Sequence, residues 1–301
     1  MPPDRLKGAA AVQVAVAPMA DEESAPRRLP WSYRARRWLL SPRPYLMLLG
    51  FAIFFGLWYL TVDYLKLPLF AKLPGLKGVA AEWFSRNPAY GTSVFTPEYY
   101  SHIWLSIQRV LIAFSLATAL GITLGLLMGW SRLFFDFTFP LLETLRPIPI
   151  LAWVPLAILM WPGKEPAIIY LTFLASFFAT ILNTLLGVQS IDQAYFRAAR
   201  CLGSSEWQIF RHVIVPGAMP FIFTGLQIGM GVAWFSLVAG EMLAGEYGLG
   251  YLIWNSYILL QFPTIIIAMI TLGAIGYFFS AVVRVVGNRL MTWKVRMEGR
   301  G

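Results

Sequence analysis

Four charged residues stand inside strongly apolar stretches of this chain: Arg109, Glu143, Arg146 and Glu241. A charge in a hydrocarbon environment costs free energy, so each needs a partner, water or a polar interface. Glu143 lies three residues before Arg146, which predicts an ion pair on one helix face. If Arg146 instead faces a hydrated path, its guanidinium would attract an anion. Arg109 and Glu241 can reach a polar interface, and we favour this solution for Arg109.

Residues typical of enzyme active sites form no recognisable pattern. His102 and His212 lie far apart and lack the spacing of metal ligands. Gly163-Lys164 lacks both the upstream glycine and the following Ser or Thr of a nucleotide-binding phosphate loop. No nucleophile–base pair of an intramembrane hydrolase is present either. We therefore predict no catalytic residue, no metal and no cofactor on this chain.

The composition is that of a membrane protein. Of 301 residues, 58% are hydrophobic and only 13% are charged, whereas a soluble domain has about 25% charged residues. The apolar residues come in blocks of about 20, the length of a membrane-spanning helix. The net charge of +9 comes from basic residues that flank these blocks, which is typical of cytosolic loops and does not indicate nucleic-acid binding. We expect an all-α, polytopic membrane protein.

Six spans and their orientation follow from these blocks. The segment 1–44 has eight Lys and Arg residues, and residues 284–301 are also basic, so both ends are expected in the cytosol. An even number of crossings agrees with this placement. The predicted spans are 45–62, 103–130, 137–161, 166–188, 217–240 and 262–286.

The third predicted span is rich in proline. Proline removes a backbone donor and kinks helices, and broken helices are tolerated at membrane depth where they line a wet cavity or are buried in protein. We therefore predict a pore-lining or gating role for this span, with Pro149 and Trp153 as candidates. Trp234, in the fifth span, is a further candidate for a gate, and Glu241 for the same path, although tryptophan is more often a packing residue. The prolines are 140, 147, 149, 155 and 162.

Glycines recur at intervals of four in two spans. Gly121, Gly125 and Gly129 form one stripe, and Gly225 and Gly229 form another. Small residues at this spacing let helix backbones approach closely in lipid. The stripes predict a compact bundle.

A polar insert interrupts the apolar chain between residues 192 and 216. It reads as two short helices joined near Gly203-Ser204-Ser205, with a serine capping the second helix. The alternative is an amphipathic segment on the membrane surface. An ordered polar helix pair in such a chain indicates a docking site for another protein.

The insert resembles the "EAA" loop of bacterial ABC importer permeases, where a cytosolic ATPase binds. It has Ala198-Ala199, three residues, Gly203, then nine residues before a segment that ends in Pro216. Arg197 stands where this family usually has glutamate, so either Arg197 pairs with an acidic ATPase residue or Glu206 takes over part of the contact. The ATPase-coupling residues implied are Arg197, Ala198, Ala199, Gly203, Glu206 and Pro216.

Further segments resemble the nitrate/sulfonate/taurine/bicarbonate branch of these permeases. The resemblance implies the type I ABC importer permease fold, with six transmembrane helices and a cytosolic coupling-helix insert. It also implies as partners a second copy of the permease, two cytosolic ATPase subunits that bind ATP, and a periplasmic or lipid-anchored substrate-binding protein. The segments are 106–111 (SIQRVL), 145–149 (LRPIP), 152–156 (AWVPL), 183–184 (NT), 223–229 (FTGLQIG), 241–243 (EML) and 247–250 (YGLG).

The expected protein is thus a multi-pass permease of the bacterial inner membrane, in contact with lipid. We divide it into a basic, partly disordered cytosolic segment 1–44, a first helix with a periplasmic loop at 45–102, a core of five helices at 103–290, and a cytosolic tail at 291–301. The coupling loop 189–216 lies within the core. The expected function is import of a small anion by alternating access.

Two other functions remain as alternatives. A secondary transporter driven by an ion gradient would need paired broken helices and intramembrane carboxylates. An intramembrane enzyme would need the catalytic groups that the sequence lacks. The substrate stays open among nitrate, bicarbonate, taurine and other sulfonates, and Arg146 is the residue that indicates an anion.

Overall fold

The computed structural model describes residue 33 and residues 40–291, and all regular structure among them is helical. The chain divides into two units, Met1–Leu57 and Trp58–Gly301. The predicted N-terminal and C-terminal tails lie largely outside the described residues. Within the first unit, α2 (Pro42–Trp58) is an apolar helix whose most apolar stretch has no buried residue. It is the start of the first predicted span.

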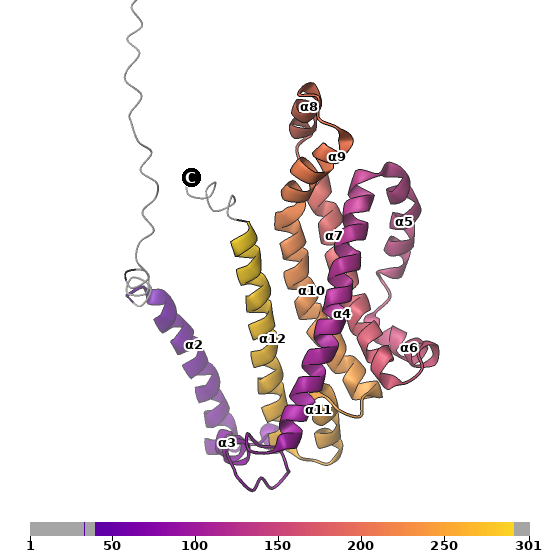
Figure 1. Cartoon of the computed structure of the whole chain (residues 1–301). Coiled ribbons are helices and arrows are strands. Elements are labelled where there is room, and N and C mark those ends of the chain that lie inside the picture. Colours follow the sequence, from indigo (N-terminus) through magenta and orange to yellow (C-terminus); the bar gives the residue numbers. More distant parts are fainter. Residues whose placement is uncertain (1–32, 34–39, 292–301) are drawn as a thin grey trace, which may run out of the picture. The chain divides into compact units, whose positions relative to one another are not determined.

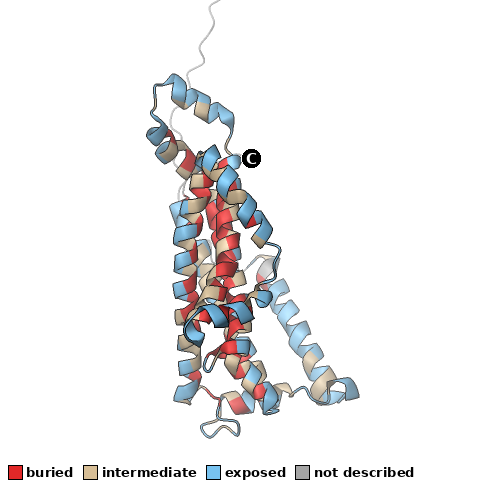
Figure 2. Ribbon diagram, turned by 90° about the vertical axis from the view of Figure 1, so that its right-hand side faces the viewer, coloured by how far each residue is buried: buried red, intermediate tan, exposed pale blue. Residues whose placement is uncertain are grey.

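Three long helices form the core of the second unit: α4 (Pro97–Trp130), α7 (Lys164–Gln189) and α10 (Val215–Ala244). They lie side by side, with α7 between the other two (Figure 1). α4 has 34 residues and is about 50 Å long, more than the hydrocarbon thickness of a bilayer. Buried positions follow the centre of this unit, and 61% of the most apolar stretch of α7 is buried (Figure 2).

The glycine stripes lie at these helix contacts, as predicted. A Cβ atom at Gly125 would be 2.6 Å from Thr184 Cβ, and one at Gly129 would be 2.5 Å from a Val188 side-chain carbon. On α10, a Cβ atom at Gly225 would be 2.6 Å from Asn183 Cβ. α4 and α10 therefore pack on α7 at a separation that larger residues would not allow.

The third predicted span, 137–161, is broken in the middle, as its prolines indicate. α5 (Arg132–Leu145) ends before a turn, and η3 (Ile150–Trp153) leads into the short α6 (Val154–Met160). The two parts are bent by 92°. The break falls at Pro147 and Pro149, which lack backbone donors and disfavour helical conformation in the residue before them.

The short remaining elements lie at opposite ends of the second unit, whereas α12 (Phe262–Leu290) is a long helix that contacts α10 and α11 (Figure 1). We call one end, with α8 and α9, the α8 end, and the other, with α3 and α11, the α11 end. Among described residues, five helices are long and apolar enough to span a membrane, and the bent pair makes six if it counts as one span. The elements are η1 (Tyr59–Tyr64), η2 (Pro68–Phe70), α3 (Leu76–Trp83), α8 (Gln193–Cys201), α9 (Glu206–Ile209), η4 (Phe210–Ile214), α11 (Leu249–Ile258) and α12 (Phe262–Leu290).

Candidate functional site: the insert, two cavities and a buried ion-pair cluster

The polar insert forms the two short helices that its sequence predicts. The Asp192 side chain caps α8 by accepting a hydrogen bond from the Ala194 N–H at 2.8 Å. Gly203 ends α8 with φ of 75°, a conformation that glycine adopts without strain. Ser205 and Gln208 form a reciprocal capping box on α9. Residues of the insert itself therefore set where both helices begin and where α8 ends.

The insert presents an exposed apolar surface. α8 has no buried residue, and Leu202 is 85% exposed. On the next segment Trp207 is 60% exposed and stacks on Phe210, while Ile209 is buried and anchors the insert to the bundle. α9 continues through η4 into α10, so the second half of the insert and α10 form one helical rod, Glu206–Ala244.

Five of the six predicted coupling residues belong to α8, to α9 or to the joint between them, and Pro216 is the second residue of α10. Arg197 and Ala198 are exposed, whereas Ala199 and Pro216 are partly buried. Glu206 pairs with Arg200 at 3.5 Å across the joint between α8 and α9, with both side chains mostly exposed. Among the ion pairs of the described residues, none includes Arg197, whose side chain is exposed.

A cavity of about 490 Å³ lies between α5 and α7, with Ile228 of α10 at its edge. Most of its lining is apolar, and we call it the polar cavity only to mark the four polar side chains that it also contains. Arg146 and Glu143 line it and face each other at 3.9 Å, which confirms the predicted pair. Both side chains are more than half exposed, so the pair is loose and either partner can turn to a ligand. Asn183 and Gln189 add amide groups to the same cavity.

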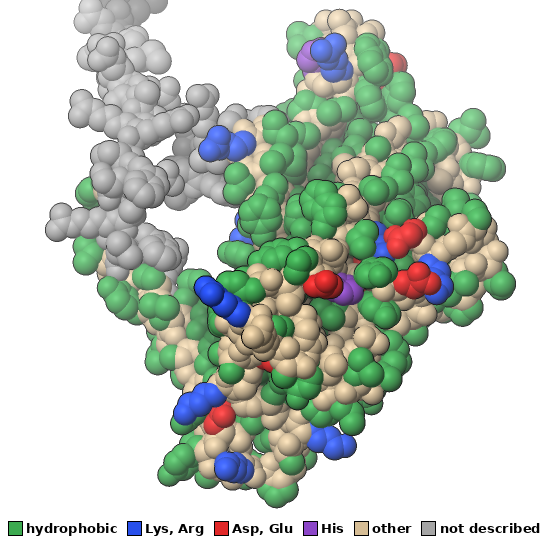
Figure 3. Space-filling model, turned by 60° about the horizontal axis from the view of Figure 1, so that its bottom comes forward, with side chains coloured by type: hydrophobic (Ala, Val, Ile, Leu, Met, Phe, Trp, Pro, Cys, Tyr) green, Lys and Arg blue, Asp and Glu red, His purple; other side chains and the backbone are tan. Residues whose placement is uncertain are grey.

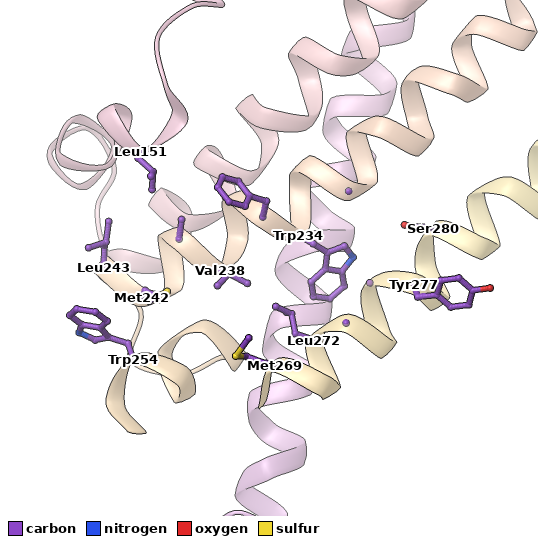
Figure 4. A pocket seen from close by; sticks show the side chains of 15 residues that line it. Leu151, Trp234, Val238, Met242, Leu243, Trp254, Met269, Leu272, Tyr277 and Ser280 are labelled. Atoms are coloured by element: carbon purple, nitrogen blue, oxygen red, sulfur yellow. The ribbon is translucent and has the colours of Figure 1, made fainter. Parts of the chain in front are cut away.

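A second cavity, of about 700 Å³, is almost wholly apolar (Figure 4). It lies beside α10, α11 and α12, and Leu151 of η3 closes one side. Trp234 forms a wall of this cavity and packs against Phe279, with ring centres 6.0 Å apart. The remaining lining residues include Val238, Met242, Leu243, Trp254, Met269, Leu272 and Tyr277.

The five predicted pathway residues do not meet in one place. Arg146 lines the polar cavity and Trp234 the apolar one. Trp153 packs with residues of α6 and α7, and Pro149 is exposed at the break before η3. Glu241 is fully buried at the α11 end of α10.

Arg109 and Glu241 meet inside the protein, so the expectation that Arg109 reaches an interface is wrong. Arg109 is 2% exposed and Glu241 is fully buried. The guanidinium donates to Glu241 Oε1 at 2.6 Å, to the Tyr247 carbonyl at 2.6 Å and to Glu165 Oε2 at 2.7 Å. A second Arg109–Glu165 contact makes that pair bidentate. Arg109 thus has ion-pair partners on two other helices.

Sequence reasoning missed Glu165, Ser106 and the hydrogen-bonding role of His102. Ser106 donates to Glu241 at 2.8 Å, and His102 Nδ1 accepts from the Gly248 N–H at 3.0 Å. The signal that could have found Glu165 is its position as a carboxylate at the start of an apolar helix. Nothing local marks the other two.

The surface of the α11 end mixes charged and hydrophobic side chains. Figure 3 shows basic and acidic side chains interspersed with hydrophobic ones on the side turned to the viewer. Beside the buried cluster, Lys164 and Glu246 form an exposed ion pair at 2.8 Å. The hydrogen bond from Lys164 lowers the pKa of Glu246 below its ordinary value.

A bundle of long apolar helices with one broken span and an exposed helical insert is the architecture of a polytopic membrane protein. Residues 119–293 match the family described as binding-protein-dependent transport system inner membrane component. The chain belongs to this family, and it is the permease of an ABC importer.

Relatives extend over most of the chain. A probable ABC transporter permease of Brucella abortus (strain 2308) is 37% identical over 83% of this chain and 96% of its own length. The taurine transport system permease TauC of Escherichia coli (strain K12) is 33% identical over 91% and 97%. The nitrate import permease NrtB of Synechocystis sp. (strain ATCC 27184 / PCC 6803 / Kazusa) is 40% identical over 58% and 63%.

A solved structure confirms the fold. A chain of a bacterial ABC transporter involved in the import of the acidic polysaccharide alginate superimposes with a TM-score of 0.54 at 16% identity. The match covers 86% of this chain and 98% of that chain. At this identity the likeness concerns the fold alone.

Proposed function

We propose that two copies of this chain form the translocation pathway of an ATP-driven importer for a small anion. The observation that carries the proposal is the self-capped, exposed insert that runs without interruption into α10. A surface of this kind suits a cytosolic ATPase, and ATP would be bound and hydrolysed on that separate subunit. The chain itself would supply no catalytic group.

The orientation follows from charge. Arg197, Arg200 and Arg211 lie on the insert, which favours the cytosol for the α8 end. The α11 end would then face the periplasm, where a substrate-binding protein delivers its cargo. Both chain termini would lie in the cytosol.

Transport would proceed by alternating access. ATP binding draws the two ATPases together, and each insert moves with its ATPase. The movement passes through the helical rod that joins α9 to α10 and opens the pathway towards the periplasm. Hydrolysis returns the pathway to its inward-facing form.

An anionic substrate agrees with the polar cavity. Arg146 supplies the positive charge, and its loose pair with Glu143 can open when an anion arrives. Two relatives are named for taurine and nitrate transport; nitrate is a small anion, and taurine carries a sulfonate group. The broad candidates are nitrate, bicarbonate, taurine and other sulfonates.

The test is the ATPase rate of the reconstituted permease with its candidate ATPase. The binding protein is added empty, or loaded from a panel of small anions. Stimulation by one loaded protein would support the importer and identify its substrate. An assembled complex that ignores every anion would remove the anion from the proposal. Failure of any ATPase to bind would favour a transporter driven by an ion gradient.

A further inference from the structure

The buried ion-pair cluster joins the three core helices at the α11 end. Arg109 belongs to α4, Glu165 to the first turn of α7, and Glu241 to the last turn of α10. One guanidinium therefore holds a carboxylate from each of the other two helices. A planar guanidinium with five donors can do this, whereas a lysine ammonium cannot form the same bidentate contact.

The same cluster fixes the loop between α10 and α11. The Gly250 N–H donates to Glu241 Oε2 at 2.8 Å, and the Leu249 N–H donates to Ser106 Oγ at 2.9 Å. Gly248, with φ of 123°, passes so close that a Cβ atom there would be 2.3 Å from the Glu241 carboxyl carbon. The loop is therefore folded over the Glu241 carboxylate and held by groups of α4.

Towards the α8 end the same helices are already locked by packing. The Gly129–Val188 contact joins α4 to α7, and a Cβ atom at Gly187 would be 2.8 Å from Phe221 Cβ of α10. Interiors packed this closely transmit displacement without absorbing it.

At the α11 end α7 and α10 remain in contact: Ile168 and Leu237 are fully buried, and Ser236 donates a hydrogen bond to the Leu171 carbonyl at 3.0 Å. The contact is less close at Gly240, where a Cβ atom would be 3.5 Å from Ile168 Cγ2, an ordinary van der Waals distance. The ion-pair cluster adds a polar connection between the three helices at this end.

We propose that Arg109 is a positioning residue for transport: it makes α4, α7, α10 and the α10–α11 loop move as one block. The inference rests on the proposed function, because the movement starts at the insert. A displacement of α8 and α9 enters α10 directly. With the ion-pair cluster intact, this displacement reaches the α11 end undiminished. When the cluster is broken, α10 and the α10–α11 loop can shift relative to α4 and α7, and ATP is hydrolysed without opening the pathway.

The test uses the full permease with its ATPase and binding protein in liposomes. The first variant, Arg109→Lys, keeps the positive charge but cannot form the bidentate contact of a guanidinium. The second variant is Glu165→Gln; the Glu165 side chain is 57% exposed, so we expect the folded protein to tolerate this change better. The matched control is Lys164→Gln, which removes the exposed neighbouring pair from the same helix end. Uptake and ATP hydrolysis are measured together.

We expect ATP hydrolysis to stay within about twofold of the unsubstituted protein, and uptake per ATP to fall at least about tenfold in both cluster variants. In the Lys164→Gln control, uptake per ATP hydrolysed should equal that of the unsubstituted protein. A purely structural role would lower both rates in proportion to the amount of folded complex, and would leave the ratio unchanged. An unchanged ratio in correctly assembled Glu165→Gln protein would overturn the inference.

A distance measurement gives a second readout. Spin labels at Leu202 in both copies report the separation of the inserts, and labels at Leu260 report the α11 end; these side chains are 85% and 67% exposed. A non-hydrolysable ATP analogue should change both distances in the unsubstituted protein, and only the Leu202 distance in Arg109→Lys. Equal changes at both ends in that variant would overturn the inference. If the unsubstituted complex shows no ATP-driven uptake, the proposed function itself fails.

Discussion

Arg109 Nη1 lies 2.6 Å from Glu241 Oε1, although 132 residues separate them in the sequence. Both side chains are almost completely removed from solvent. Removing one member of a buried pair leaves an uncompensated charge, which costs about 3–5 kcal/mol. Arg109→Gln should therefore lower the thermal midpoint of the detergent-solubilised protein by several degrees, as measured by tryptophan fluorescence.

The exposed Lys164–Glu246 pair is the control for this loss. Surface pairs contribute little, since water and salt screen them. Lys164→Gln should lower the thermal midpoint by much less than Arg109→Gln does. Equal losses in the two variants would mean that Arg109 is not held in a dry environment.

The exposed pair also predicts a weak pH dependence. The pKa of Glu246 is lowered in the folded protein. The larger cause is the hydrogen bond that Lys164 donates, and the smaller cause is the positive charge of Lys164. A lowered folded pKa adds stability above the ordinary value of 4.5, and that stability is lost as the pH falls through the lowered pKa. The difference in thermal midpoint between the unsubstituted protein and Glu246→Gln should be constant from neutral pH to about pH 5 and vanish in more acidic buffer. If the difference in thermal midpoint grew on acidification, the predicted direction of the pKa shift would be wrong.

A substitution at Gly203 can test whether transport depends on the conformation of the insert. The φ of 75° at Gly203 is closed to proline, whose φ is fixed near −65°, and the Gly203 N–H donates to the Arg200 carbonyl at 3.0 Å. Gly203→Pro should misplace α9 relative to α8 and abolish uptake, while the two permease copies still assemble. Co-purification of the ATPase and uptake into liposomes are the measurements. Ser204→Ala, next to it in the same joint, should behave like the unsubstituted protein. Normal uptake in Gly203→Pro would remove the insert from the mechanism.

Local patterns were enough to predict much of the fold. The serine cap of α9 and the glycine at the end of α8 act within a few residues, so the sequence shows them directly. The prolines likewise marked the break between α5 and η3. The positions of the prolines do not predict that the break turns the chain by 92°, because this angle depends on packing against α7.

The buried cluster could not be predicted in the same way. Arg109 is an isolated charge in an apolar run, and interfacial exposure was the simplest explanation of it. Its partners are 56 and 132 residues away, on helices whose relative rotation no local pattern specifies. Sequence reasoning identified the costly charge and missed the groups that compensate for it.

The polar cavity gives opposite predictions for two neighbouring residues. Arg146→Gln removes the positive charge that faces the cavity, whereas Glu143→Gln removes the carboxylate 3.9 Å away that competes with an anion. At an effective dielectric constant near 20, a unit charge at this distance is worth a few kcal/mol before solvent screening, and both side chains are partly hydrated. We therefore expect about tenfold changes: KM for anion uptake should rise in Arg146→Gln and fall or stay unchanged in Glu143→Gln. Uptake is measured in liposomes with saturating ATP and binding protein. Because both substitutions break the same ion pair, a purely structural role would change the two KM values in the same direction, and that result would exclude Arg146 as an anion-binding residue.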